Sequence, residues 1–101
     1  MILPIQKELI PYRFEYEHNG FIFTFEVHYN AEQGFYTTDL YRNDEVIIYG
    51  EKIVYGQQLF KSLNDETLPR LIPLDPSEKE NKVTYNNLSE TVFLQVIDDA
   101  I

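Results

Sequence analysis

Residues 12–29 read YRFEYEHNGFIFTFEVHY, and they carry the clearest structural signal in the chain. On both sides of Asn19-Gly20, aromatic or aliphatic residues alternate with polar ones, which is typical of strands with one buried face. Asn-Gly favours a two-residue type I′ turn because both central positions need a positive φ. The stretch therefore predicts a β-hairpin.

A two-residue turn also determines which residues of the hairpin face one another. The predicted pairs are His18 with Phe21, Tyr16 with Phe23, Phe14 with Phe25 and Tyr12 with Val27. In this register the aromatic side chains of both strands lie on one face, whereas a slip of one residue would place them opposite charged ones. Turn chemistry and hydrophobic pattern thus predict the same pairing.

Further strands are predicted downstream of the hairpin. Residues 35–41 and 45–49 are extended runs rich in aromatic and β-branched residues, and the polar residues 42–44 between them predict a second turn. A short apolar run follows at 53–55. Residues 57–64 fit a single helical turn as well as the end of a strand.

The C-terminal part of the chain predicts shorter elements. Three prolines within residues 68–76 cannot donate ladder hydrogen bonds, so this stretch predicts an edge strand or an extended loop. Residues 77–82 are charged and predict an exposed segment, followed by a short extended piece at 83–85. Residues 91–97 predict a last, well-buried strand because they leave little polar face.

The whole chain, residues 1–101, is predicted to form a single all-β domain, mainly antiparallel. We expect a small barrel or sandwich with at most one short helical turn. A chain of this length has room for one core. Its 44% hydrophobic content, with eight Tyr and seven Phe, supplies enough apolar bulk to offset the ordering entropy.

Charge and composition exclude several classes of function. The net charge is −9, and eight basic residues against seventeen acidic ones argue against nucleic acid as a ligand. There are no cysteines, which removes disulfides and thiolate chemistry. The apolar start of the chain is too short for a signal peptide, and no stretch approaches a membrane span. We therefore expect a protein outside any membrane.

Residues that could carry chemistry do not form a recognisable catalytic pattern. His18 and His28 are predicted to lie on opposite sides of the hairpin, so a shared metal site is not expected. With seventeen acidic residues, some pair will reach the separation that glycoside hydrolysis needs, so such a pair indicates nothing. No catalytic, cofactor-binding or metal-binding residue is predicted, and neither is enzymatic activity. Tyrosines that could instead line a ligand surface or a subunit interface are Tyr36, Tyr41, Tyr49 and Tyr55.

The order of several short motifs resembles a known family. The matching pieces are residues 3–5, 14–30, 34–36, 39–40, 48–60, 83–88 and 91–94. The two-glycine segment from Gly50 to Leu59 and the piece Tyr85-Asn86-Asn87-Leu88 are the more specific. On these residues the chain resembles the small baseplate plug proteins found in the tail gene clusters of many phages and prophages. It departs from them at Phe35, where the family often has tryptophan, and at Ser89, where it usually has glycine.

The resemblance implies a compact antiparallel β domain in the tail baseplate of a virion, made in the cytoplasm of the bacterial host. It implies contacts with hub, tail-tube or wedge proteins, or with further copies of itself, and no cofactor or catalysis. We expect residues 35–41 to be an edge available to a partner, while the prolines of residues 68–76 protect another.

Two other classes of function are weighed against the structural one. The first is a β-barrel module that binds a ligand or a carbohydrate through its tyrosines. The second is an acidic inhibitor that mimics nucleic-acid charge and blocks a DNA-binding protein.

Overall fold

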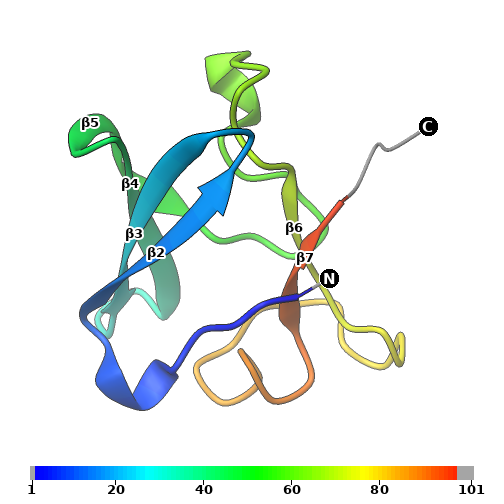
Figure 1. Cartoon of the computed structure of the whole chain (residues 1–101). Coiled ribbons are helices and arrows are strands. Elements are labelled where there is room, and N and C mark those ends of the chain that lie inside the picture. The colour runs from blue at the N-terminus through cyan, green and yellow to red at the C-terminus, as the bar shows by residue number, and fades with distance from the viewer. Residues whose placement is uncertain (1, 98–101) are drawn as a thin grey trace.

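The computed structural model describes residues 2–97, which form two antiparallel sheets (Figure 1). One has four strands in the order β2-β3-β4-β5, and the other has three in the order β1-β7-β6. The strands are β1 (Ile2–Leu3), β2 (Tyr12–His18), β3 (Phe21–Asn30), β4 (Phe35–Arg42), β5 (Glu45–Lys52), β6 (Leu71–Leu74) and β7 (Phe93–Val96). The predicted all-β class is confirmed, and over residues 2–97 the sheets do not close into a barrel.

The described part of the chain contains two single 3-10 turns, where at most one helical turn was predicted. They are η1 (Lys7–Leu9) and η2 (Lys61–Leu63). The second lies within the stretch that fitted either a helical turn or a strand end, and it is flanked by Phe60 (φ 62°) and Asn64 (φ 52°). Left-handed residues on both sides keep the helix to one turn. Within residues 2–97 no helix is long and apolar enough to cross a membrane.

The first hairpin has the predicted register. His18 pairs with Phe21 and Tyr12 with Val27, with the pairs between them in step. Asn19 and Gly20 have φ of 52° and 81°, as a type I′ turn requires. The pattern of alternation places Phe23, Phe25 and Val27 in the core, each at most 1% exposed. The structure thus confirms both the predicted turn and the predicted buried face of the hairpin.

The second hairpin is longer than predicted. Strand β5 continues to Lys52, although it was expected to end before Gly50. The pairing with β4 is interrupted between Thr38 and Tyr41 by register shifts, and Gly50 has a φ of 73°. Its amide donates to the Asp39 carboxylate at 2.8 Å. A bulge accommodates the left-handed glycine without ending the strand.

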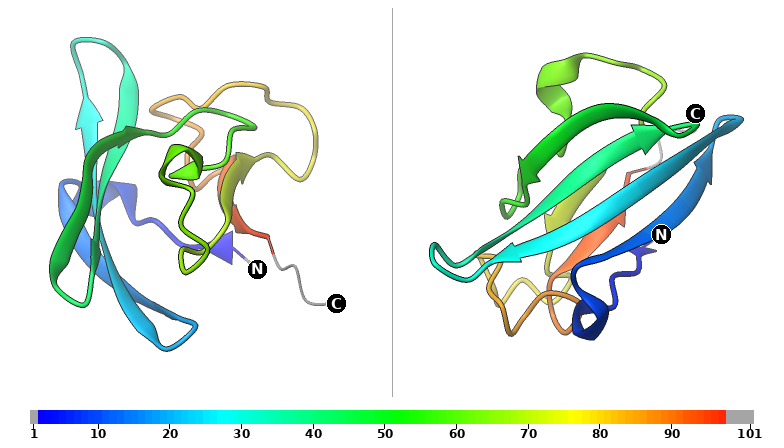
Figure 2. Two further views of the ribbon diagram at one scale, coloured as in Figure 1. Left: turned by 90° about the horizontal axis from the view of Figure 1, so that it is seen from above. Right: turned by 90° about the vertical axis from the view of Figure 1, so that its left-hand side faces the viewer.

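The two sheets face each other across one hydrophobic core, as Figure 2 shows from two sides. Its most buried side chains include Tyr36 and Leu40 of β4 and Leu71 of β6, all at 0% exposure. The connecting segments add to it. Buried core residues outside the strands are Ile5, Ile53, Leu59, Phe60, Leu68 and Leu88.

Three predictions about edges and ends are corrected by the topology. Strand β4 lies between β3 and β5, so it is not an available edge: both of its neighbours in sequence form hairpins with it. The edges of this sheet are β2 and β5, whereas β6 is an edge as its prolines predicted. Residues 83–85 form no strand, and residues 91–97 are a strand only at Phe93–Val96.

The turn after Leu88 keeps a conformation that favours glycine although the residue there is Ser89. Its φ is 67°. The Ser89 hydroxyl donates to the carbonyl of Ile5 at 2.6 Å, and its amide donates to the carbonyl of Val92 at 2.8 Å. These bonds hold the N-terminal segment against the turn and offset the cost of the left-handed backbone.

Candidate interaction surfaces

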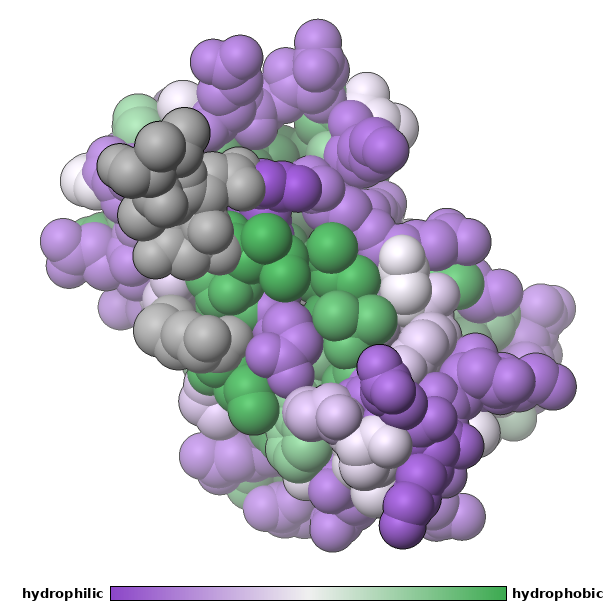
Figure 3. Space-filling view, turned by 90° about the vertical axis from the view of Figure 1, so that its right-hand side faces the viewer, coloured by the Kyte–Doolittle hydropathy of each residue, from purple (hydrophilic) through white to green (hydrophobic). Residues whose placement is uncertain are grey.

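The outer side of the three-stranded sheet carries four apolar side chains and one uncharged polar side chain, Gln95. Ile2 and Ile72 both pair with Gln95, and Leu74 pairs with Phe93, so the five side chains share one face of the sheet. Ile2 is 40% exposed, and the other four are half-buried. We call these five residues the apolar face. Figure 3, which looks onto this side of the molecule, shows an apolar patch with a hydrophilic side chain within it and hydrophilic residues at its border.

This arrangement corrects the expectation that the last strand is well buried. In β7 only Leu94 is buried, because it points inward while Phe93 and Gln95 point outward. None of the five residues of the apolar face carries a charge, although the chain has a charged fraction of 25%. Depletion of charge and enrichment of apolar side chains are the features of a protein–protein interface core.

A cleft of about 840 Å³ opens between the tip of the first hairpin and the segment after residue 57. Tyr16, His18 and Phe60 line it together with the polar side chains of Gln58 and Arg70. Phe60 holds a left-handed conformation that bulky residues rarely adopt. Its amide donates to the Glu51 carboxylate at 2.7 Å, which helps to hold this backbone in place.

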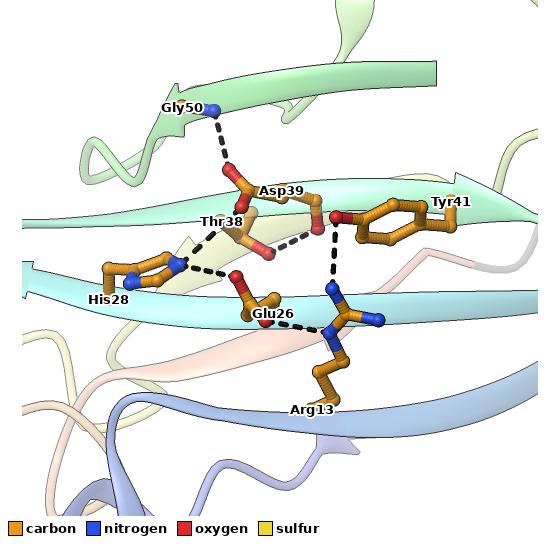
Figure 4. A network of polar contacts seen from close by, with 7 residues as sticks. All are labelled: Arg13, Glu26, His28, Thr38, Asp39, Tyr41 and Gly50. Atoms are coloured by element: carbon orange, nitrogen blue, oxygen red, sulfur yellow. Dashed lines mark hydrogen bonds and ion pairs between the residues drawn. The ribbon is translucent and has the colours of Figure 1, made fainter. Parts of the chain in front are cut away.

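The outer face of the four-stranded sheet carries a polar network (Figure 4). Glu26 of β3 pairs directly with Asp39 of β4, and His28 lies two residues further along the same face of β3. His28 Nε2 lies 2.8 Å from Glu26 Oε2 and 3.4 Å from Asp39 Oδ2. Arg13 Nε donates to Glu26 Oε1 at 2.6 Å, and Arg13 Nη2 donates to the Tyr41 hydroxyl at 3.2 Å.

The hydrogen bond from Arg13, followed by that from His28, holds the pKa of the Glu26 carboxyl below its usual range. Glu26 is therefore ionised at neutral pH. The same carboxylate raises the pKa of the Arg13 guanidinium. The network thus presents a permanent charge pair beside an imidazole and the second carboxylate, Asp39.

The two histidines lie on opposite sides of the hairpin, as predicted. His18 stacks on Tyr16 with ring centroids 5.9 Å apart and lines the cleft. His28 lies on the outer face with Glu26 and Asp39. The alternation in β3 indicates that Glu26 and His28 share a face. The sequence did not predict that Asp39 joins them, because the position of Asp39 depends on the register between β3 and β4.

The tyrosines proposed for a ligand surface separate into two groups. Tyr36 belongs to the core, where its hydroxyl donates to the carbonyl of Tyr85 at 2.8 Å. Tyr55 accepts a hydrogen bond from the Asp75 amide. Tyr41 and Tyr49 lie on the outer face of the four-stranded sheet in edge contact, and Tyr49 is 66% exposed. The four tyrosines therefore do not form one continuous surface.

Comparison with curated proteins found no match. A family model described as "Cyanophage baseplate Pam3 plug gp18" matches residues 1–99, nearly the whole length of the chain. The match confirms the family that the motifs in the sequence indicated. The chain therefore belongs to the phage baseplate plug family, whose members are structural components of the tail baseplate.

Proposed function

We propose that the protein is a non-enzymatic part of the tail baseplate and assembles with hub, tail-tube or wedge proteins through its apolar face. The observation that carries the proposal is the uncharged outer side of the three-stranded sheet. Ile2, Ile72 and Phe93 lie together there, outside the hydrophobic core. Burial of such side chains against a partner contributes roughly 25 cal/mol per Å² of apolar area.

The net charge of −9 acts at longer range than the apolar contact. It keeps the separate subunit soluble before assembly and favours encounter with a basic surface. Docking onto such a surface weakens as salt screens the attraction. An apolar contact without charge complementarity keeps its strength in salt.

The test is to mix the purified protein with candidate hub, tail-tube and wedge proteins at low and high salt, and to detect complexes by gel filtration. Ile2→Glu places a charge on the apolar face. Ile22→Glu is the matched control, because Ile22 is 47% exposed, similar to the 40% of Ile2, but lies in the other sheet.

We expect Ile2→Glu to abolish the complex and Ile22→Glu to retain it. Loss of the complex in both variants or in neither would reject the apolar face as the docking surface. Failure of the unaltered protein to bind any of the tail proteins would reject the assembly proposal itself.

The cleft favours a second candidate, a module that binds a ligand or carbohydrate. Tyr16 and Phe60 offer aromatic surfaces for stacking, and Gln58 offers hydrogen bonds. A glycan array and binding titrations separate the two proposals. Saturable sugar binding that Tyr16→Ala removes, without binding to any tail protein, would favour this second function.

A further inference from the structure

We propose that Glu26, His28 and Asp39 form a binding site for one divalent transition-metal ion of the zinc class. The inference rests on the polar network of the four-stranded sheet and not on the proposed role in assembly. His28 Nε2 and one oxygen from each carboxylate all lie within 4.8 Å of one another (Figure 4). Imidazole and carboxylate groups are both ligands of zinc in proteins.

The backbone brings these three side chains together on paired strands. Glu26 and Asp39 face each other across β3 and β4, and His28 is two residues from Glu26, so all three project from the same side. Both strands are internal in the sheet, with β2 and β5 beside them. Sites on such paired elements hold their ligands more precisely than sites on loops.

In each carboxylate, one oxygen accepts a hydrogen bond from another residue of the chain and the other oxygen points toward His28. Arg13 Nε donates to Glu26 Oε1 at 2.6 Å, and the Gly50 amide donates to Asp39 Oδ1 at 2.8 Å. The remaining oxygens, Oε2 and Oδ2, are those that approach Nε2. Donors of this kind orient the carboxylates of metal sites and tune their affinity.

The distances suit a small ion. A tetrahedral zinc ion with ligands at about 2.0–2.1 Å places neighbouring ligand atoms about 3.3 Å apart. The two separations from His28 Nε2 are 2.8 and 3.4 Å. Small side-chain rotations therefore suffice to admit the ion between Nε2 and the two oxygens.

The ligand set also selects the class of ion. Calcium and magnesium prefer oxygen ligands, whereas imidazole favours Zn²⁺, Ni²⁺ and Cu²⁺. The side chain of Asp39 is 12% exposed and that of Glu26 is 23% exposed, so the carboxylates are only partly hydrated. Three protein ligands leave a fourth position open to water or to a side chain of a neighbouring protein.

Without metal, His28 Nε2 is hydrogen-bonded to Glu26 at 2.8 Å. A metal ion must replace a proton at this nitrogen, since only the unprotonated atom coordinates. A network held together by hydrogen bonds alone is the alternative. The two cases differ in whether zinc binds with saturation and whether His28 is required.

The experiment is to titrate Zn²⁺ into the full chain by calorimetry and to record the visible spectrum with Co²⁺ in place of zinc. We expect one ion per chain and a spectrum typical of four-coordinate cobalt. His28→Gln should weaken binding at least tenfold, and Asp39→Asn should weaken it while keeping an oxygen for the Gly50 amide. His18→Gln is the matched control and should bind as the unaltered protein does.

Circular dichroism of each variant shows whether the fold is kept. A His28→Gln variant that folds and binds zinc as tightly as the unaltered protein would overturn the proposal. So would an unaltered protein that shows no saturable zinc binding, since the cluster would then be a network of ion pairs alone. Equal affinity for Ca²⁺ would reject the assigned class of ion.

Discussion

Replacement of Gly20 by valine tests the turn on which the first hairpin depends. Gly20 has a φ of +81°, and a Cβ atom built on it meets nothing within 4 Å. The cost is therefore conformational and not steric. A left-handed conformation costs an L residue roughly 1–2 kcal/mol, and a β-branched residue adopts it least readily.

Part of this cost is offset in the unfolded chain. Replacing glycine there reduces the conformational entropy lost on folding, which returns roughly 0.4–1 kcal/mol. Because a positive φ costs a β-branched residue more than an ordinary L residue, we expect Gly20→Val to lower the free energy of unfolding by about 1 kcal/mol or more after this offset. With a urea dependence of about 1–3 kcal/mol per M, the unfolding midpoint falls by roughly 0.5 M.

The assay is urea unfolding followed by circular dichroism, since the chain has no tryptophan. Gly20→Asn is the matched control, because asparagine tolerates the left-handed region and its midpoint should stay near that of the unaltered protein. A Gly20→Val midpoint equal to that of the unaltered protein would refute the reasoning. An equal loss in both variants would show that φ is not the cause.

Four further predictions concern the interior and the loops. Leu40→Ala should cost about 2–5 kcal/mol in the same assay, because Leu40 is 0% exposed in the core. Tyr36→Phe should cost about 1 kcal/mol through the lost hydrogen bond to Tyr85. Because burial raises the pKa of Tyr36 to about 12, its absorbance change should fall outside the ordinary tyrosine titration. Hydrogen bonds from the Ser77 hydroxyl and from neighbouring amides hold the pKa of the Asp75 carboxyl below its ordinary value of 3.8. The ionised Asp75 therefore stabilises the fold fully above pH 3.8, and this stabilisation is lost as the pH falls below 3.8. Asp75→Asn should flatten the acid side of a plot of unfolding midpoint against pH.

The two hairpins were predictable because their information is local. Asn19-Gly20 specifies a turn, and period-two alternation on either side specifies which side chains are buried. The end of β5 was not predictable in the same way. In the sequence, Gly50 indicates the end of the strand. In the structure a bulge and a hydrogen bond from the Gly50 amide to Asp39 allow β5 to continue past it.

The candidate sites show the same limit. The polar face of β3 follows from alternation, so the neighbourhood of Glu26 and His28 was available from the sequence. Asp39 joins them only through the pairing of β3 with β4. The apolar face is harder still to predict, because Ile2 and Ile72 are far apart in the chain and come together only by pairing with opposite sides of β7.

The amino-acid sequence by itself therefore specifies the all-β class, the register of the first hairpin and, through its motifs, the family. These depend on residues near in sequence or on motifs in a particular order. Only the pairing of neighbouring strands decides that β4 is internal and that Asp39 lies beside Glu26. The apolar side that faces solvent depends on pairings between segments far apart in the chain. Side chains alternate between the two faces of a strand whichever partner it has, so the sequence predicts two faces for Phe93–Val96 but not what covers each of them.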